Sequence, residues 1–275
     1  MTKDLMFPAT QAGLTAALKN TGVKSNSVVF LQADIRRIGR LDNLMDRTLL
    51  LQAYFNAFFT ILGKQGTLVV MSGTDVACGI RGEPFIFEET PSEQGVLTEF
   101  IRQCEQSKRS MHPLFSVAAI GPKADEICGS PSKSAFGFGS PYEKLIEANA
   151  LNVFLGVDVK RAAVIRYFEQ IYGVPYCYTK EWTMPIWRAG KKIKERYFGL
   201  VRYLNCGVDH DSFQFENDLF ESNLVKTAKV GRGNVHVVNS RDMSKVAITG
   251  LSSDPFYFLE KQPLKEPWKR TMMSS

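Results

Sequence analysis

The segment SVVFLQADIRRIGRLDNLMDRTLLLQAYFNAFFTILGKQGTLVVMSG, residues 27–73, contains two apolar strand patterns on either side of one long helical pattern. Residues 27–35 and 66–73 are short runs rich in β-branched and other apolar residues, which is typical of buried strands. Residues 47–63 between them have the length and residue types of a helix. A strand, a helix and a second strand with continuous apolar runs predict a parallel βαβ unit whose sheet is covered on both faces.

Further strand patterns follow this unit, with helical patterns between them. They lie at residues 114–121, 152–157 and 234–239. No proline- or serine-rich linker divides the chain, and no repeat of fixed period appears. The sequence therefore predicts an α/β fold, in which one central sheet, mostly parallel or mixed, is flanked by helices in a single domain over residues 1–275.

The stretch AVIRYFEQIYGVPY, residues 163–176, predicts a helix with a defined end. Gly173 stands where a left-handed C-terminal cap is needed, and Pro175 prevents continuation. Arg166 and Glu169 are three residues apart, so their side chains are neighbours on one face of this helix.

Two capping boxes predict further helix starts. TPSE at residues 90–93 and SPYE at residues 140–143 each place a hydroxyl residue, a proline and a glutamate at the positions that begin a helix. The free amides of such a helix end also favour an anion such as a phosphate.

The composition is that of an ordinary globular protein, with 44% hydrophobic and 23% charged residues. No apolar run approaches the ~20 residues of a membrane span, and the first residues do not resemble a secretory signal. We therefore expect a cytoplasmic protein without membrane contact. The five cysteines form no C-x-x-C pair, which argues against a disulfide framework and a structural zinc site, and no metal is expected.

The net charge of +6 is modest, but it is unevenly distributed. Residues 188–202 contain six Lys and Arg residues against Glu195 alone. No nucleic-acid-binding motif accompanies these charges, so we expect no nucleic-acid partner.

Several stretches together resemble the aminoglycoside 3-N-acetyltransferase family, in the same order and with similar spacing. They are GTLVV (66–70), TPSEQGVLTEF (90–100), KRSMHPLFSVAAIGPKA (108–124), FGFGSPYEKLIEANALNVFLGV (136–157) and the 163–176 helix. The resemblance covers most of the chain. It implies the family's own α/β fold and transfer of an acetyl or other acyl group from acetyl-CoA, or another acyl-CoA, to a primary amine of an amino sugar or related acceptor.

By this resemblance, residues of three regions are expected to contact CoA. A guanidinium suits a phosphate, and a hydroxyl suits the amides of a pantetheine arm. The expected coenzyme-binding residues are Ile35, Arg36, Arg109, Ser110, His112, Ser116, Phe138 and Ser140.

The chain departs from the family at the expected proton acceptor. Where the family's helix carries a histidine three residues before a glutamate, this chain keeps Glu169 and has Arg166 instead. Gln32-Ala33-Asp34 likewise stands where the family has a histidine followed by serines. An arginine is not deprotonated near neutral pH, so it is not a general base.

Three consequences stay open for this site. In the first, the amine loses its proton before it attacks a thioester that mainly needs positioning. In the second, Glu169, Asp34 or His112 takes the proton. In the third, the protein binds CoA without turnover. The expected catalytic residues are Glu169, Arg166, His112 and Asp34, with Arg166 orienting Glu169 or binding an anionic acceptor.

The region at about residues 177–212 is expected to be an insertion on the acceptor side. Its cations, Lys191, Lys192 and Lys194 among them, favour an anionic acceptor over a polycationic aminoglycoside. The alternatives are a non-catalytic CoA-binding or protein-interaction member of the family, and an aminoglycoside-modifying resistance enzyme. A homodimer is compatible with the sequence.

Overall fold

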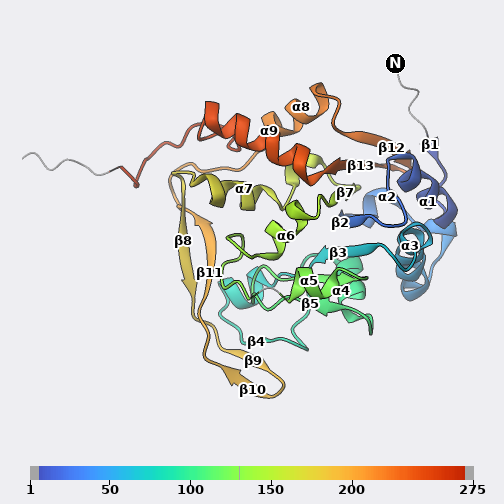
Figure 1. The fold of residues 1–275 in the computed structure, drawn as a ribbon, viewed down its shortest axis with the longest axis horizontal. Helices are drawn as coiled ribbons and strands as arrows, with labels where there is room; N and C mark the ends of the chain where they lie inside the picture. Colours follow the sequence, from blue (N-terminus) through green and yellow to red (C-terminus); the bar gives the residue numbers. More distant parts are fainter. Residues whose placement is uncertain (1–5, 130, 270–275) are drawn as a thin grey trace, which may run out of the picture.

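A mixed eight-stranded sheet forms the centre of the computed structural model, which describes residues 6–129 and 131–269 (Figure 1). Its strand order is β1-β12-β13-β7-β2-β3-β6-β5. Strand β2 pairs in parallel with both β3 and β7, whereas β13 pairs with β7 and β6 pairs with β3 in antiparallel fashion. The predicted α/β class is confirmed, and the sheet is mixed.

The strands of this sheet are β1 (Met6–Phe7), β2 (Val28–Ala33), β3 (Thr67–Met71), β5 (Lys108–Arg109), β6 (Val117–Ile120), β7 (Leu151–Leu155), β12 (Lys226–Val230) and β13 (Gly233–Asn239). The strands outside it are β4 (Phe85–Ile86), β8 (Cys177–Trp182), β9 (Ile186–Arg188), β10 (Lys191–Ile193) and β11 (Tyr197–Arg202).

The helices are α1 (Gln11–Asn20), α2 (Ile35–Ile38), α3 (Arg47–Leu62), α4 (Val96–Gln103), α5 (Ala124–Cys128), α6 (Pro141–Glu147), α7 (Ile165–Tyr172), α8 (Phe213–Glu221) and α9 (Ser240–Ser253). Single helical turns are η1 (Leu41–Asn43), η2 (Asp75–Ile80) and η3 (Val159–Arg161).

Helices cover both faces of the sheet because side chains alternate along the strands. In β2, Val28 and Phe30 join the apolar core under α5 to α9, whereas Val29 and Leu31 join the core under α1, α3 and α4. All four side chains are buried. This double burial explains why the strand reads as a continuous apolar run.

A pair of hairpin-like sheets projects from this three-layer body. Strands β8 and β11 pair antiparallel and lead to the β9–β10 hairpin, which pairs with β4 (Figure 1). These strands occupy most of the region predicted as an acceptor-side insertion at about 177–212. That the region is an insertion stays a prediction.

The helix α7 ends as expected, because Gly173 adopts the left-handed conformation with φ 79°. Ser140 caps α6 by accepting a hydrogen bond from the Glu143 amide at 3.3 Å, so that capping box is confirmed. The helix start predicted at residues 90–93 is wrong. Helix α4 begins at Val96, and Glu93 instead accepts hydrogen bonds from the amides that begin η2.

Within the described residues, no helix combines the length and the apolar character needed to cross a bilayer.

Candidate active site

Helix α7 places Arg166 and Glu169 side by side on its polar face. Arg166 Nη1 donates to Glu169 Oε2 at 2.7 Å, and Arg166 Nη2 donates to the carbonyl oxygen of Leu200 on β11 at 3.0 Å. The Glu169 side chain is fully buried, whereas that of Arg166 is 26% exposed. The two catalytic candidates on this helix are therefore neighbours, as their spacing predicts.

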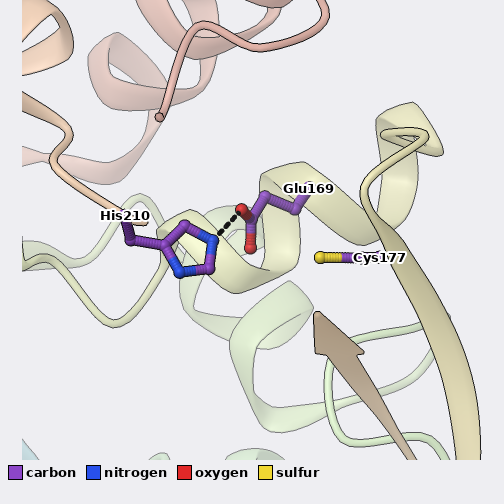
Figure 2. Close-up of side chains that lie close together, drawn as sticks. All are labelled: Glu169, Cys177 and His210. Carbon is purple, nitrogen blue, oxygen red and sulfur yellow. Dashed lines mark hydrogen bonds and ion pairs between the residues drawn. The ribbon is translucent and has the colours of Figure 1, made fainter. Parts of the chain in front are cut away.

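A histidine from another part of the chain completes this pair. His210 lies in the loop between β11 and α8, and its Nε2 is 2.7 Å from Glu169 Oε1 (Figure 2). The hydroxyl of Tyr176 donates to the same oxygen at 2.9 Å. Glu169 thus accepts from an arginine, a histidine and a tyrosine.

Two contacts compete for Nε2 of His210, and the closer one sets the tautomer: Glu169 Oε1 lies 2.7 Å from Nε2, whereas Arg166 Nη1, which only donates, lies 3.3 Å away. An ionised carboxylate only accepts, so Nε2 of His210 carries the proton that bonds to Glu169. In the neutral ring the lone pair is then on Nδ1, for which no hydrogen-bond partner is found among residues 6–129 and 131–269. Nδ1 is the ring atom that can accept a proton.

Burial and charge compete over the ionisation of Glu169. Burial alone would raise the pKa of this carboxyl, but the hydrogen bond from His210 and the charge of Arg166 outweigh it, so the pKa is lowered. Burial would likewise lower the pKa of Arg166, but the Glu169 carboxylate raises it. The pair is therefore ionised at neutral pH.

Cys177 at the start of β8 lies beside this group. Ligand atoms of Glu169, Cys177 and His210 are within 4.8 Å of one another (Figure 2). Arg166 Nη1 contacts all three, at 2.7 Å from Glu169 Oε2, 3.3 Å from His210 Nε2 and 4.0 Å from Cys177 Sγ. The Arg166 guanidinium therefore occupies the position that a metal ion bound by these three residues would take. Burial raises the pKa of Cys177 to about 12, so this residue is a thiol rather than a thiolate.

Two cavities meet at Arg166 and His210. We call the first the α7 cavity; it measures about 290 Å³ and also involves Lys160, Arg161, Ala163 and Asp211. We call the second the hairpin cavity; it measures about 490 Å³ and is also lined by Asp75, Phe115, Tyr178, Lys180, Trp182 and Arg202. Both volumes are near or within the range of small-molecule sites.

A third space, the strand-end cavity, adjoins the α7 cavity. It measures about 320 Å³, shares Arg161 and Ala163 with the α7 cavity, and lies where β2 and β3 end, at Ala33 and Met71. The carboxyl ends of parallel strands are the usual location of ligand sites in α/β sheets. The three cavities therefore form a series from the sheet edge, past His210, to the hairpin β8–β11.

Gln32 on β2 connects the sheet to the segment before α7. Its Oε1 accepts from the Ala163 amide at 2.8 Å, and its Nε2 donates to the Arg161 carbonyl at 2.9 Å. Gln32 thus holds the wall that the α7 and strand-end cavities share.

Three of the residues predicted to contact CoA, namely Arg109, Ser110 and Ser116, form hydrogen bonds within the protein. Arg109 donates to the carbonyl oxygens of Phe87, Thr90 and Ser72 at 2.6 to 3.2 Å. The hydroxyls of Ser110 and Ser116, both at most 1% exposed, bond within the sheet region, to the Val117 amide and the Ser72 carbonyl. These contacts give the three residues structural roles, and contact of any of them with CoA stays a prediction.

His112, which is predicted to be catalytic and to contact CoA, is enclosed by the backbone. It is 4% exposed, its Nδ1 accepts from the amides of Leu114 and Phe115, and its Nε2 lies 3.0 Å from the Phe198 carbonyl. Burial lowers its pKa to about 4. Both ring nitrogens of His112 are occupied by the backbone, and its catalytic and CoA-binding roles stay predictions.

Three of the predicted site residues, Asp34, Ile35 and Arg36, lie at the start of α2. Asp34 caps this helix and accepts from the Arg36 guanidinium at 2.9 and 3.0 Å, which lowers the Asp34 pKa. Arg36 is largely exposed, and the carbonyl of Ile35 bonds to the amide of Gly39. The structure does not connect Asp34 to Glu169, so its catalytic role stays a prediction.

Two coenzyme candidates lie at α6. Ser140 is fully buried as the helix cap, and Phe138 before it is 91% exposed. Coenzyme contact by either residue stays a prediction.

The basic residues of segment 188–202 are divided between two places. Lys191 and Lys192 belong to β10, and Lys194 follows that strand, in the hairpin that pairs with β4. Arg202 on β11 lines the hairpin cavity, together with Lys180 on β8. That the segment lies on the acceptor side stays a prediction.

The comparisons with known proteins show the family and agree with the fold. Residues 30–252 match the family described as aminoglycoside 3-N-acetyltransferase. The chain is 29% identical to the aminoglycoside N(3)-acetyltransferase IV of Salmonella sp., over 90% of each chain. Its fold is similar to the apoenzyme of aminoglycoside acetyltransferase AAC(3)-IVa, with 25% identity, a TM-score of 0.73, and coverage of 95% and 94%. It is also similar to AAC-IIIb solved as a binary complex with CoASH, with 20% identity, a TM-score of 0.76, and coverage of 93% and 100%.

Fold and site together define an α/β protein with an imidazole and a carboxylate paired between two cavities. The match over residues 30–252 establishes the family: the chain belongs to the aminoglycoside 3-N-acetyltransferases.

Proposed function

We propose that this protein is an acyl-CoA-dependent N-acyltransferase that moves an acetyl group from acetyl-CoA to a primary amine, with His210 as the general base. Membership of the family supports the reaction class, and the CoASH complex of the similar AAC-IIIb supports CoA as the co-substrate. The acceptor belongs to the amino sugars and related amines that the relatives' names indicate.

One observation carries the proposal: His210 is paired with an ionised carboxylate and lies where two cavities meet. The thioester would approach through the α7 and strand-end cavities, and the acceptor amine through the hairpin cavity. An imidazole is the side chain whose ordinary pKa lies near neutrality, which suits a general base.

The proposed step is a direct attack. The amine nitrogen bonds to the thioester carbonyl carbon while its proton moves to His210 Nδ1, and the bond from carbon to sulfur then breaks. The imidazolium returns the proton to the departing sulfur, so the products are the amide and CoA thiol. Glu169 stabilises the imidazolium and holds the tautomer, as a carboxylate does for a catalytic histidine.

Arg166 has a positioning role in this proposal. It is too basic to accept a proton near neutral pH, and it holds the Glu169 carboxylate while its other nitrogen bonds to the Leu200 carbonyl. By the family resemblance, Arg166 stands where a histidine is expected on this helix, and His210 reaches the same glutamate from the loop before α8. This arrangement favours an active enzyme over the non-catalytic alternative.

The substitution His210→Gln tests the proposal. We expect kcat to fall by about 10²- to 10⁴-fold, the range for loss of a general base, while calorimetric affinity for acetyl-CoA changes little. CoA release is followed with a thiol-trapping dye. His236→Gln is the matched control, because His236 lies on β13 and its Nδ1 bonds to the Thr227 hydroxyl. Equal activity of the His210 variant and the parent would contradict the assignment.

A further inference from the structure

The hairpin cavity contains a cluster of aromatic side chains on one face of the β8–β11 ribbon. Tyr178, Lys180 and Trp182 alternate along β8, so they point to the same side. All three line the cavity, together with Phe115. A flat or apolar part of an acceptor would pack against this wall.

The absence of a side chain at Gly199 lets aromatic rings pack against β11. Gly199 on β11 stands opposite Lys180 in the register. A Cβ at Gly199 would lie 2.9 Å from both Phe115 Cε2 and Trp182 Nε1, which is closer than such atoms approach. The two rings therefore pack over Gly199, and no side chain opposes Lys180 across the strand pair.

The charges around the cavity are mostly positive. Its cations are Arg166, Lys180 and Arg202, and its carboxylate is Asp75. Arg166 is already neutralised by Glu169. Lys180 Nζ lies 4.3 Å from the Trp182 ring centroid, and within the described part of the chain neither Lys180 nor Arg202 forms an ion pair. Arg202 pairs with Cys177 in the register, so its side chain starts from the opposite face of the ribbon to that of Lys180. Both residues line the cavity, and among the described residues neither has a carboxylate partner within ion-pair distance.

We propose that the hairpin cavity accepts a primary amine that also carries a carboxylate or phosphate, and that Lys180 and Arg202 select it. This inference rests on the proposed N-acyltransferase function and names the acceptor class of the same site. The acceptor's anionic group pairs with one of these two cations, which line different parts of the cavity, while its amine reaches His210. A polycation would place its charges against Lys180 and Arg202, which is unfavourable in a partly enclosed site. The relatives are named for aminoglycosides, so this chain differs from them in acceptor.

The test compares amines of matched shape. Para-(aminomethyl)benzoate and para-(aminomethyl)phenyl phosphate carry the two anionic groups, benzylamine carries none, and kanamycin is a polycation. We expect kcat/KM for at least one anionic amine to exceed that for benzylamine by about tenfold or more, and to exceed that for kanamycin, because charge-assisted hydrogen bonds favour the anion. The two anionic arms show whether the site takes a carboxylate or a phosphate.

Charge reversal identifies the selecting residues. Lys180→Glu combined with Arg202→Glu should reduce the ratio of anionic to neutral turnover by about tenfold or more and leave the KM for acetyl-CoA unchanged. Lys191→Glu combined with Lys192→Glu makes the same charge change on the β10 hairpin and should leave the ratio unchanged. If the Glu variant does not fold, Lys180→Gln with Arg202→Gln should show the same direction, with benzylamine turnover as the measure of intact enzyme.

The outcomes separate the two proposals. Faster turnover of kanamycin than of either anionic amine, or an unchanged ratio in the charge-reversal variants, overturns the acceptor class and leaves the acyltransferase function standing. No release of CoA with any amine overturns the proposed function itself.

Discussion

At the scale of single residues, Glu169 organises the site. It is fully buried, and an isolated buried carboxylate is costly unless it is paired and hydrogen-bonded. Arg166, His210 and Tyr176 supply those bonds from α7, the loop before α8 and the loop before β8. The carboxylate therefore fixes three separate segments at the point where the cavities meet.

His112 predicts a measurable pH dependence of stability. Burial lowers its folded-state pKa to about 4 from the ordinary value of 6.5. Between these values the unfolded chain binds a proton that the folded chain does not, so this stabilising contribution is complete above about pH 6.5 and decreases as the pH falls. We expect a loss on the order of 3 kcal/mol by about pH 4, measured as the free energy of unfolding in denaturant.

The variant His112→Gln is the comparison for this effect, because every other titrating group is retained. Its stability should be lower than that of the parent at pH 7 and should depend less on pH between 7 and 5. A ring C2 proton of His112 that titrates by NMR near the ordinary histidine value would contradict the buried, neutral state.

The sequence predicts two members of the candidate catalytic group, Arg166 and Glu169, but not the third, His210. Arg166 and Glu169 follow from helical spacing, because residues three apart are neighbours. His210 is 41 residues from Glu169 in sequence, and only the packing of the loop before α8 against α7 brings it to the carboxylate. Because the chain contains three histidines and Arg166 cannot act as a general base, the scarcity of histidine is a signal for His210.

At the scale of elements, Arg109 joins β5 to two other segments. Its guanidinium bonds to the Ser72 carbonyl after β3 and to carbonyls of Phe87 and Thr90 after β4. It also lies 4.8 Å from the centroid of the Phe85 ring. Arg109 therefore ties the strand β4, which pairs with β9, to the main sheet.

Truncation of Arg109 is expected to affect stability. Arg109→Ala leaves these carbonyls without their donor, so the free energy of unfolding should fall by about 3 kcal/mol, the upper range for a hydrogen bond to a charged group. Lys108→Ala is the matched control; its exposed ammonium lies 3.6 Å from Asp125, and its loss should cost less than about 1 kcal/mol.

Calorimetry with acetyl-CoA decides between the two roles of Arg109. An affinity per folded molecule equal to that of the parent agrees with the structural role. A large loss of affinity in a fully folded variant would restore the coenzyme contact that the sequence predicts.

The elements with a periodic apolar pattern are those that the sequence predicts well. β2, α3, β3, β7 and α7 are found within a few residues of their expected bounds because burial on one or both faces dictates their composition. The ribbon β8–β11 is largely polar and exposed on one face, so its pattern is weak. The error at residues 90–93 has a related cause: Glu93 caps a different helical turn, η2, which local sequence does not indicate.

At the scale of the whole molecule, the cavities adjoin one another. The strand-end and α7 cavities share Arg161 and Ala163, and the α7 and hairpin cavities share Arg166 and His210. Two substrates are therefore expected to occupy opposite sides of His210 at the same time. Such an arrangement holds the amine and the thioester together, which is the main requirement for attack on a reactive acyl donor.

This arrangement predicts a ternary-complex mechanism rather than an acyl-enzyme intermediate. Initial rates at varied acetyl-CoA and amine should give intersecting double-reciprocal lines, and acetyl-CoA alone should leave no acetyl group on the protein by mass spectrometry.

Cys177 is the nearest thiol to the site, but burial raises its pKa to about 12, which leaves little nucleophilic thiolate at neutral pH. Cys177→Ser should therefore retain activity within about threefold of the parent, because an inert buried thiol contributes no step. Parallel lines, together with an acetylated protein that the Cys177 variant does not form, would show that the acyl group passes through the enzyme and that the two cavities are filled in turn.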